Sequence, residues 1–201
     1  MKKIYIGFAV IGLLALTIMI YLSGGEVDEP TTAATETATT AEPTTAEQFL
    51  QDFVAGKTTR EVAEYLEIRG VDSPVFAVAF PDRLELTYEE SYLNLYDEYF
   101  YVSIAPFINE THECVMHVLT GCQGELTQAD LEVKITNSSG DVVFAGTQQT
   151  YQNGFMGFWL PRNEDYTIEF EFEGYQGEFY FSTHDDDQTC LTEFRLINPN
   201  N

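Results

Sequence analysis

Basic side chains are scarce in this sequence. It holds 9 Lys and Arg residues against 33 Asp and Glu residues, which gives a formal net charge of -24 at pH 7. Binding to a phosphate backbone needs clustered Lys and Arg side chains, so the composition excludes a nucleic-acid partner. The acidic surface favours solubility and attracts cations, but it does not select one metal over another.

Signatures of common catalytic sites are also absent. The sequence has no glycine-rich phosphate loop, no nucleophile elbow and no Ser-His-Asp arrangement. The acidic run of Asp185, Asp186 and Asp187 lacks the glycine and the distal glutamate of an EF-hand calcium loop. We therefore expect a binding protein and not a conventional enzyme.

The N-terminal residues predict export. Lys2 and Lys3 precede an uncharged apolar run from Ile4 to Leu22, which would be about 28 Å long as a helix and close to the thickness of the membrane hydrocarbon. The positive-inside rule keeps the Lys pair in the cytoplasm and exports the rest. Because no Ala-x-Ala cleavage site follows, residues 1–22 are interpreted as a membrane anchor in preference to a cleaved signal sequence. Both readings place the protein outside the cytoplasmic membrane.

The remaining chain divides into a linker and one folded domain. Residues 23–46 are mostly Thr, Ala, Glu, Pro and Gly without apolar periodicity, which is typical of a disordered linker. The domain is predicted over residues 47–199, with a helical and β N-terminal part to about residue 110 and a β-sandwich part from about residue 124. The expected fold class is α+β, mainly β.

Two short helices are predicted at the start of this domain. The first has an apolar stripe at helical spacing and is expected to end at Gly56; the stripe consists of Phe49, Leu50, Phe53 and Val54. Thr58 and Glu61 have the spacing of a capping box for the second helix. Gly70 is expected to end this helix.

The rest of the domain has the pattern of β-strands. Apolar and polar residues alternate in most of the segments, and Gly and Asn turns separate them. Such spacing favours an antiparallel β-sandwich preceded by the helical pair. The expected strands span residues 75–80, 84–88, 99–104, 131–135, 142–144, 166–172 and 178–181.

All 3 cysteines and all 3 histidines fall in two short segments. Outside the cytoplasm cysteines usually pair, so an odd number leaves one thiol free, bonded to another chain or bound to a metal. Thiolate and imidazole are ligands that Cu(I) and Zn(II) prefer. The two segments contain His112, Cys114, His117 and Cys122, and then His184 and Cys190.

The spacing of these residues leaves several interpretations open. On a straight helix Cys114 and Cys122 would be about 12 Å apart, too far to share an ion. The segment must fold back, and Thr120-Gly121 allows a break. A metal site, a stapling disulfide with one inert cysteine, and a thiol redox centre all fit. Cu(I) needs only two or three soft ligands, whereas zinc would want a fourth from a histidine.

Longer motifs surround these residues. They are Phe100–Phe107, Thr111–Cys114, His117, Leu119–Leu126, Asn153–Arg162 and Thr189–Thr192. Together these motifs resemble the CueP family of bacterial cell-envelope copper-binding proteins, and the resemblance runs in order between Gln48 and Leu196, over nearly the whole exported part. It implies a role in copper tolerance or in copper supply to secreted enzymes.

The resemblance implies a ligand set as well. It assigns copper binding to Cys114, Cys122 and Cys190, and its motif histidines correspond to His117 and His112. His117 could equally be a hydrogen-bond partner of a ligand, and His184 lies outside the motif. We expect a Cu(I) centre of three cysteines with histidine assistance, in which two thiolates could also reduce Cu(II).

The expected partners follow from this reading. They are the copper ion, a copper-recipient envelope enzyme or a metal exporter, and the membrane through the N-terminal helix; a homodimer is left open. The alternatives are a surface-displayed β-domain with a structural disulfide that acts as an interaction module, a zinc-binding domain and a thiol oxidoreductase.

Overall fold

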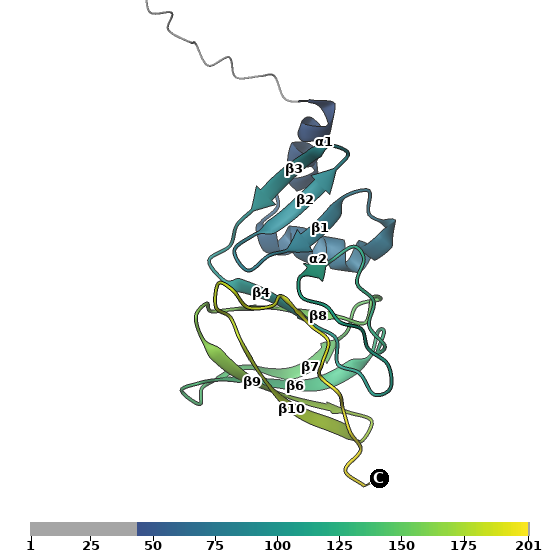
Figure 1. Ribbon diagram of the computed structural model, residues 1–201, viewed down its shortest axis with the longest axis vertical. Helices are drawn as coiled ribbons and strands as arrows, with labels where there is room; N and C mark the ends of the chain where they lie inside the picture. The colour runs from purple at the N-terminus through teal and green to yellow at the C-terminus, as the bar shows by residue number, and fades with distance from the viewer. Residues whose placement is uncertain (1–43, 201) are drawn as a thin grey trace, which may run out of the picture. The chain divides into compact units, whose positions relative to one another are not determined.

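The computed structural model describes residues 44–200 of the protein (Figure 1). The apolar run at residues 4–22, expected to be an anchor, and nearly all of the expected linker lie outside the described residues. Within residues 44–200, no helix is both long enough and apolar enough to cross a membrane. The anchor therefore stays a prediction from the sequence.

Two capped helices begin the described part: α1 spans Thr45–Val54 and α2 spans Thr59–Arg69. The capping box expected for the second helix is confirmed, because Glu61 N–H donates to Thr58 Oγ1 and the Glu61 carboxylate accepts from Thr58 N–H. These bonds satisfy backbone donors that a helix start leaves unpaired. A short 3-10 turn, η1 at Gly70–Asp72, follows α2.

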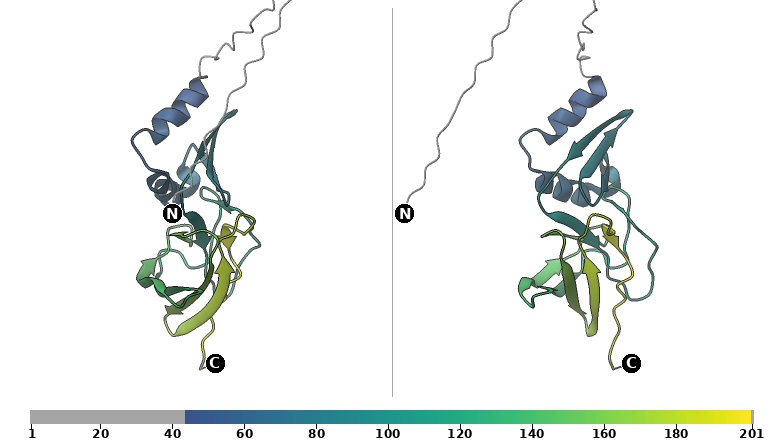
Figure 2. Two further views of the ribbon diagram at one scale, coloured as in Figure 1. Left: turned by 90° about the vertical axis from the view of Figure 1, so that its left-hand side faces the viewer. Right: turned by 60° about the vertical axis from the view of Figure 1, so that its left-hand side comes forward.

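The first sheet packs under these helices. Its strand order is β3-β2-β1-β5, and every neighbouring pair is antiparallel. The helices lie on one side of it (Figure 2), and Leu50, Val62, Leu66 and Leu86 are buried in the core between them. The strands are β1 at Phe76–Ala79, β2 at Leu84–Tyr88, β3 at Ser91–Leu95 and β5 at His117–Val118.

The second part of the fold is a sandwich of two sheets, one with order β10-β9-β6-β7 and one with order β11-β4-β8. Their facing side chains form one core that includes Leu131, Ile168 and Phe170 from the larger sheet and Met156 and Phe158 from the smaller. The remaining strands are β4 at Phe100–Ile104, β6 at Asp130–Asn137, β7 at Val142–Gln149, β8 at Met156–Leu160, β9 at Asp165–Phe172, β10 at Tyr175–Ser182 and β11 at Cys190–Leu191. The mainly-β α+β fold class is confirmed.

Strand β4 joins the two cores. All five of its residues are buried, because one face meets the sandwich core and the other meets the core under the helices. Phe100 and Ile104 belong to the first core, whereas Tyr101 belongs to the second. Beside β4 lies β11, which pairs with it in parallel and sets Cys190 opposite Ser103. The candidate site lies at this junction.

Candidate metal centre

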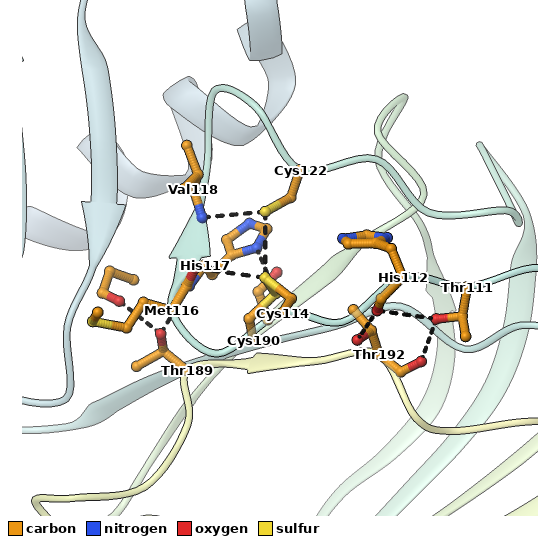
Figure 3. Close-up of a disulfide and its surroundings, with 12 residues drawn as sticks. Thr111, His112, Cys114, Met116, His117, Val118, Cys122, Thr189, Cys190 and Thr192 are labelled. Atoms are coloured by element: carbon orange, nitrogen blue, oxygen red, sulfur yellow. Dashed lines mark hydrogen bonds between the residues drawn. A yellow bond between two sulfur atoms is a disulfide. The ribbon is translucent and has the colours of Figure 1, made fainter.

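The three cysteine sulfur atoms converge at one place. A disulfide joins Cys114 to Cys190 across a sequence separation of 76, with a Cα–Cα distance of 5.6 Å. Cys122 is a free thiol, and its Sγ lies 3.6 Å from Cys114 Sγ (Figure 3). The disulfide and the free thiol are therefore neighbours. The sequence left a structural disulfide and a metal site as alternatives, and both would use the same sulfur atoms.

Cys122 reaches the cluster because the chain reverses after β5. The N–H groups of Gly121 and Cys122 both donate to the carbonyl of Val118 at 2.9 Å. The turn brings Cys122 Sγ to 3.4 Å from the N–H of Val118, which donates to it. This is the fold-back that the separation of Cys114 and Cys122 required.

Cys190 is positioned by the residue before it. Thr189 is fully buried, and its hydroxyl donates to the carbonyl of Ala79 at 2.6 Å and accepts from the N–H of His117 at 3.0 Å. Thr189 thus links β1, β5 and β11. The N–H of Cys190 donates to the carbonyl of Val115 at 3.3 Å. These bonds fix Cys190 beside His117.

The loop that carries Cys114 is fastened at two places before the cysteine. Before it, the Glu125 carboxylate accepts from the N–H groups of Ile108 at 2.6 Å and Asn109 at 2.9 Å. Partial burial acts in the opposite direction, but these donors hold the pKa of Glu125 below its usual range. Nearer the cysteine, the Thr192 hydroxyl donates to the carbonyl of His112 at 2.6 Å.

His117 is fully buried and contacts a buried glutamate. Its Nε2 lies 2.7 Å from Oε1 of Glu67 on α2, and both side chains are 0% exposed. The two atoms are at ion-pair distance, although the ring N–H is not aligned for a straight hydrogen bond. The other ring nitrogen, Nδ1, lies 3.7 Å from Cys190 Sγ. One nitrogen of His117 therefore faces a carboxylate and the other faces the sulfur cluster.

Glu67 is held by three further donors. The hydroxyl groups of Tyr101 and Ser103 donate to Oε1 at 2.6 Å and 3.2 Å, and the side-chain amide of Asn153 donates to Oε2 at 2.7 Å. A buried carboxylate needs such partners because an isolated charge in the interior is costly. Sequence reasoning missed Glu67, although it lies four residues after buried Ala63 and so falls on the apolar face of α2.

The pair carries opposite charges in the metal-free protein. Burial opposes a charge on His117, but the Glu67 carboxylate and the Cys122 sulfur favour it and raise the pKa of His117 to about 9. Burial likewise opposes a charge on Glu67, yet His117 and the hydrogen-bond donors lower the pKa of Glu67. For Tyr101, burial and the Glu67 charge raise the pKa of the phenol well above its usual value, so it remains a donor.

Apolar groups surround the sulfur atoms. Ala105, Phe155 and Cys190 form a small buried cluster against which Cys114 and Cys122 pack. The ring of Phe155 lies 4.5 Å from the ring of His117 and 6.3 Å from that of His112, centroid to centroid. A shell of this kind limits the access of water to a metal site.

The five residues predicted as ligands form two overlapping sets. In each set the ligand atoms lie within 4.8 Å of one another: His112, Cys114 and Cys122 make one, and His117, Cys122 and Cys190 make the other. Within residues 44–200, His184 belongs to neither set. Its Nε2 lies 3.7 Å from Oδ1 of Asp165, in keeping with its position outside the sequence motif.

The two sets differ in their access to solvent. His112 and Cys114 line two open hollows of about 530 and 460 Å³, and Cys122 lines the smaller one. His117 and Cys190 are 0% exposed. The acidic side chain of Glu113 lines both hollows, so a cation meets negative charge where it would approach the sulfur atoms.

Comparisons with known proteins agree with the motifs. A family model described as "Periplasmic copper-binding protein CueP" matches residues 62–195, a span that holds all five predicted ligands and Glu67. A solved structure titled "Crystal Structure of S.CueP" is 37% identical with a TM-score of 0.72, and the match covers 78% of this chain and 100% of that one. No curated protein matches.

The Glu67–His117 pair predicts a pH-dependent stability of the metal-free, disulfide-bonded protein. The pKa of His117 is raised from its unfolded value of roughly 6.5 to about 9. The stabilisation by the charged pair is therefore fully present below about pH 6.5 and is lost as the pH rises through about 9. Glu67→Gln should lower the free energy of unfolding at pH 7 by roughly 3–5 kcal/mol. In this variant the free energy of unfolding should also fall less between pH 7 and pH 10 than it does in the wild type. Urea unfolding at pH 7 and at pH 10 measures both effects.

Glu64→Gln is the matched control, because Glu64 is exposed on the same helix. It should leave both the stability and its pH dependence unchanged. If the free energy of unfolding of Glu67→Gln fell between pH 7 and pH 10 as steeply as that of the wild type, the buried pair would not be the source of the pH dependence.

Proposed function

Because the chain belongs to the CueP family of periplasmic copper-binding proteins, we propose that it holds Cu(I) through Cys114, Cys122 and Cys190, with His117 and His112 assisting. The observation that carries the proposal is the convergence of three sulfur atoms beside a carboxylate-anchored imidazole. Thiolate sulfur is a soft ligand and selects Cu(I), which needs few ligands. Zinc would favour a closed set of four.

Glu67 supports a ligand role for His117. A metal-binding histidine commonly turns its second ring nitrogen to a carboxylate, which fixes the ring and the nitrogen that keeps its proton. Glu67 faces Nε2, so that proton stays on Nε2. Nδ1, which faces Cys190, gives up its proton when copper binds and then supplies the lone pair for the metal. The carboxylate also favours the electron-rich imidazole that binds a cation well.

The disulfide supports a redox link to copper. Cys114 and Cys190 can bind Cu(I) only as thiolates, so the bridge must first accept two electrons. In the reverse direction, two thiolates give one electron each to two Cu(II) ions, which become Cu(I) as the Cys114–Cys190 bond forms. The reaction is balanced without a further reagent, and the two sulfur atoms already lie within bonding reach.

The family is periplasmic, which fits export of the domain. We propose that the apolar run from Ile4 to Leu22 tethers it to the cytoplasmic membrane and that the site serves copper tolerance or passes copper to an envelope enzyme or an exporter. Retention of the full-length protein in washed membranes, against release of a chain that begins after Leu22, tests the tether.

One observation favours a second function. The Cys114–Cys190 bridge would staple a β-domain that acts as an interaction module without a metal, because a disulfide of this kind stabilises a fold by about 2–4 kcal/mol. The free thiol of Cys122, 3.6 Å from the bridge, is unexplained by this reading. In the copper-binding reading it is a ligand.

Cys122→Ser tests the copper centre. Cys122 belongs to both ligand sets, so its loss should weaken Cu(I) binding beyond the roughly 10–100-fold that removal of a supporting residue costs. The measurement is an oxygen-free titration of the reduced full-length protein against a chromophoric Cu(I) chelator. His184→Ala should bind like the wild type. Equal affinities for Cys122→Ser and the wild type would contradict the assignment.

Addition of Cu(II) to the reduced protein without oxygen tests the redox step. Two of the three thiols should disappear, one disulfide should form, and two equivalents of Cu(I) should appear for each disulfide. Thiol counting and mass spectrometry of unreduced peptides follow the reaction. Thiols that remain intact after Cu(II) is added would leave copper binding without a reductase activity.

A further inference from the structure

We propose that copper occupies two successive stations that share Cys122. The outer station consists of His112, Cys114 and Cys122, and the inner station consists of His117, Cys122 and Cys190. This inference rests on the proposed Cu(I) function and assigns different tasks to the two histidines. The outer station receives the ion, and the inner station holds it.

The geometry divides the ligands in this way. Ligand atoms within each station lie within 4.8 Å of one another, and Cys122 belongs to both. The two imidazole rings approach the sulfur atoms from different sides (Figure 3). The ring of Phe155 packs at 4.5 Å from His117 and at 6.3 Å from His112. Each histidine thus has its own partner cysteine, and Cys122 is common to both.

Burial gives the two stations their order. His112 is exposed, Cys114 and Cys122 are partly buried, and all three line the hollow of about 460 Å³. Both His117 and Cys190 are 0% exposed, so an ion from solution meets the outer station first. Cys122 belongs to both stations, so it is the ligand that connects the outer one to the inner one.

The inner ligands are also held more rigidly than the outer ones. His112 and Cys114 lie on the loop before β5, where His112 is exposed and Cys114 is partly buried, and Thr192 and Glu125 hold the backbone of this loop. In the inner station His117 lies on β5 and Cys190 on β11, and Glu67 fixes the far nitrogen of His117. Rigid, dry ligand sets hold a metal more firmly than exposed ones.

Transfer between the stations is a ligand exchange. Cu(I) first bound by Cys114, Cys122 and His112 keeps its bond to Cys122 while Cys190 and His117 replace the other two ligands. The Cys190 thiol and the Nδ1–H of His117 each release a proton; the freed Cys114 thiolate takes up one of them and the other passes to solvent. Copper remains Cu(I), so the step needs no electron donor or acceptor.

The disulfide connects the two stations. It joins Cys114 of the outer station to Cys190 of the inner station. One oxidation therefore removes a ligand from each station at once. Only the reduced protein can load copper or retain it.

Rapid mixing of reduced, oxygen-free, full-length protein with a Cu(I)–chelator complex tests the proposal. The wild type should show two phases: a first whose rate rises with the concentration of the complex, and a second whose rate does not. His112→Ala and Cys114→Ser should slow the first phase roughly ten- to a hundredfold and should weaken equilibrium binding less than Cys190→Ser does. Cys190→Ser should lose the second phase and bind more weakly. His184→Ala is the matched control for His112→Ala and should behave like the wild type.

The outcomes separate this inference from the function on which it rests. A single phase in the wild type, or an equilibrium loss in His112→Ala as large as that in Cys190→Ser, would mean one undivided site and would overturn the two stations while copper binding stands. No competition with the chelator by any variant would overturn the proposed function, and the stations with it. Should Cys190→Ser fail to fold, as judged by circular dichroism, His112→Ala and Cys114→Ser decide, since both change the solvent-facing loop.

Discussion

The contact between Glu67 and His117 organises the region around the candidate metal centre. Both side chains are 0% exposed, and their charged atoms lie 2.7 Å apart. Burial of either charge alone would be costly, so each residue requires the other. Glu67 comes from α2 and His117 from β5, and the hydroxyl groups that complete the carboxylate shell come from β4. One ion pair therefore ties a helix to two sheets and turns Nδ1 of His117 toward the cysteines.

The Glu67–His117 ion pair places the site at the junction of the two cores. Strand β4 is buried on both faces, with Phe100 in the sandwich core and Tyr101 in the core under the helices. Strand β11 lies along β4 and brings Cys190 to the same place, while Thr189 bonds to β1 and β5. His117 and Cys190, far apart in the chain, thus rest on strands, as a preorganised site requires. Cys114 and His112 lie on the loop before β5, and Cys122 lies in the turn after it.

Many of the regular parts of the fold could be predicted from the sequence because they carry local signals, although β3 and β8 are not among the expected strands. The box of Thr58 and Glu61 marks a helix start, and the alternation in β9 marks a half-buried strand, both confirmed. The two-residue strands β5 and β11 are too short to show any periodicity.

The candidate site divides in the same way. The cysteines and histidines stand out because they are rare and clustered, but the pairing of Cys114 with Cys190 could not be read from the chain, since any two of the three cysteines could pair. The role of Glu67 depends on contacts with three other elements, which no local pattern encodes. An X-ray absorption spectrum of the reduced protein loaded with one equivalent of Cu(I) identifies the atoms bound to copper. We expect scattering from thiolate sulfur together with one imidazole, whereas a spectrum with only oxygen and nitrogen neighbours would rule out the cysteines as ligands.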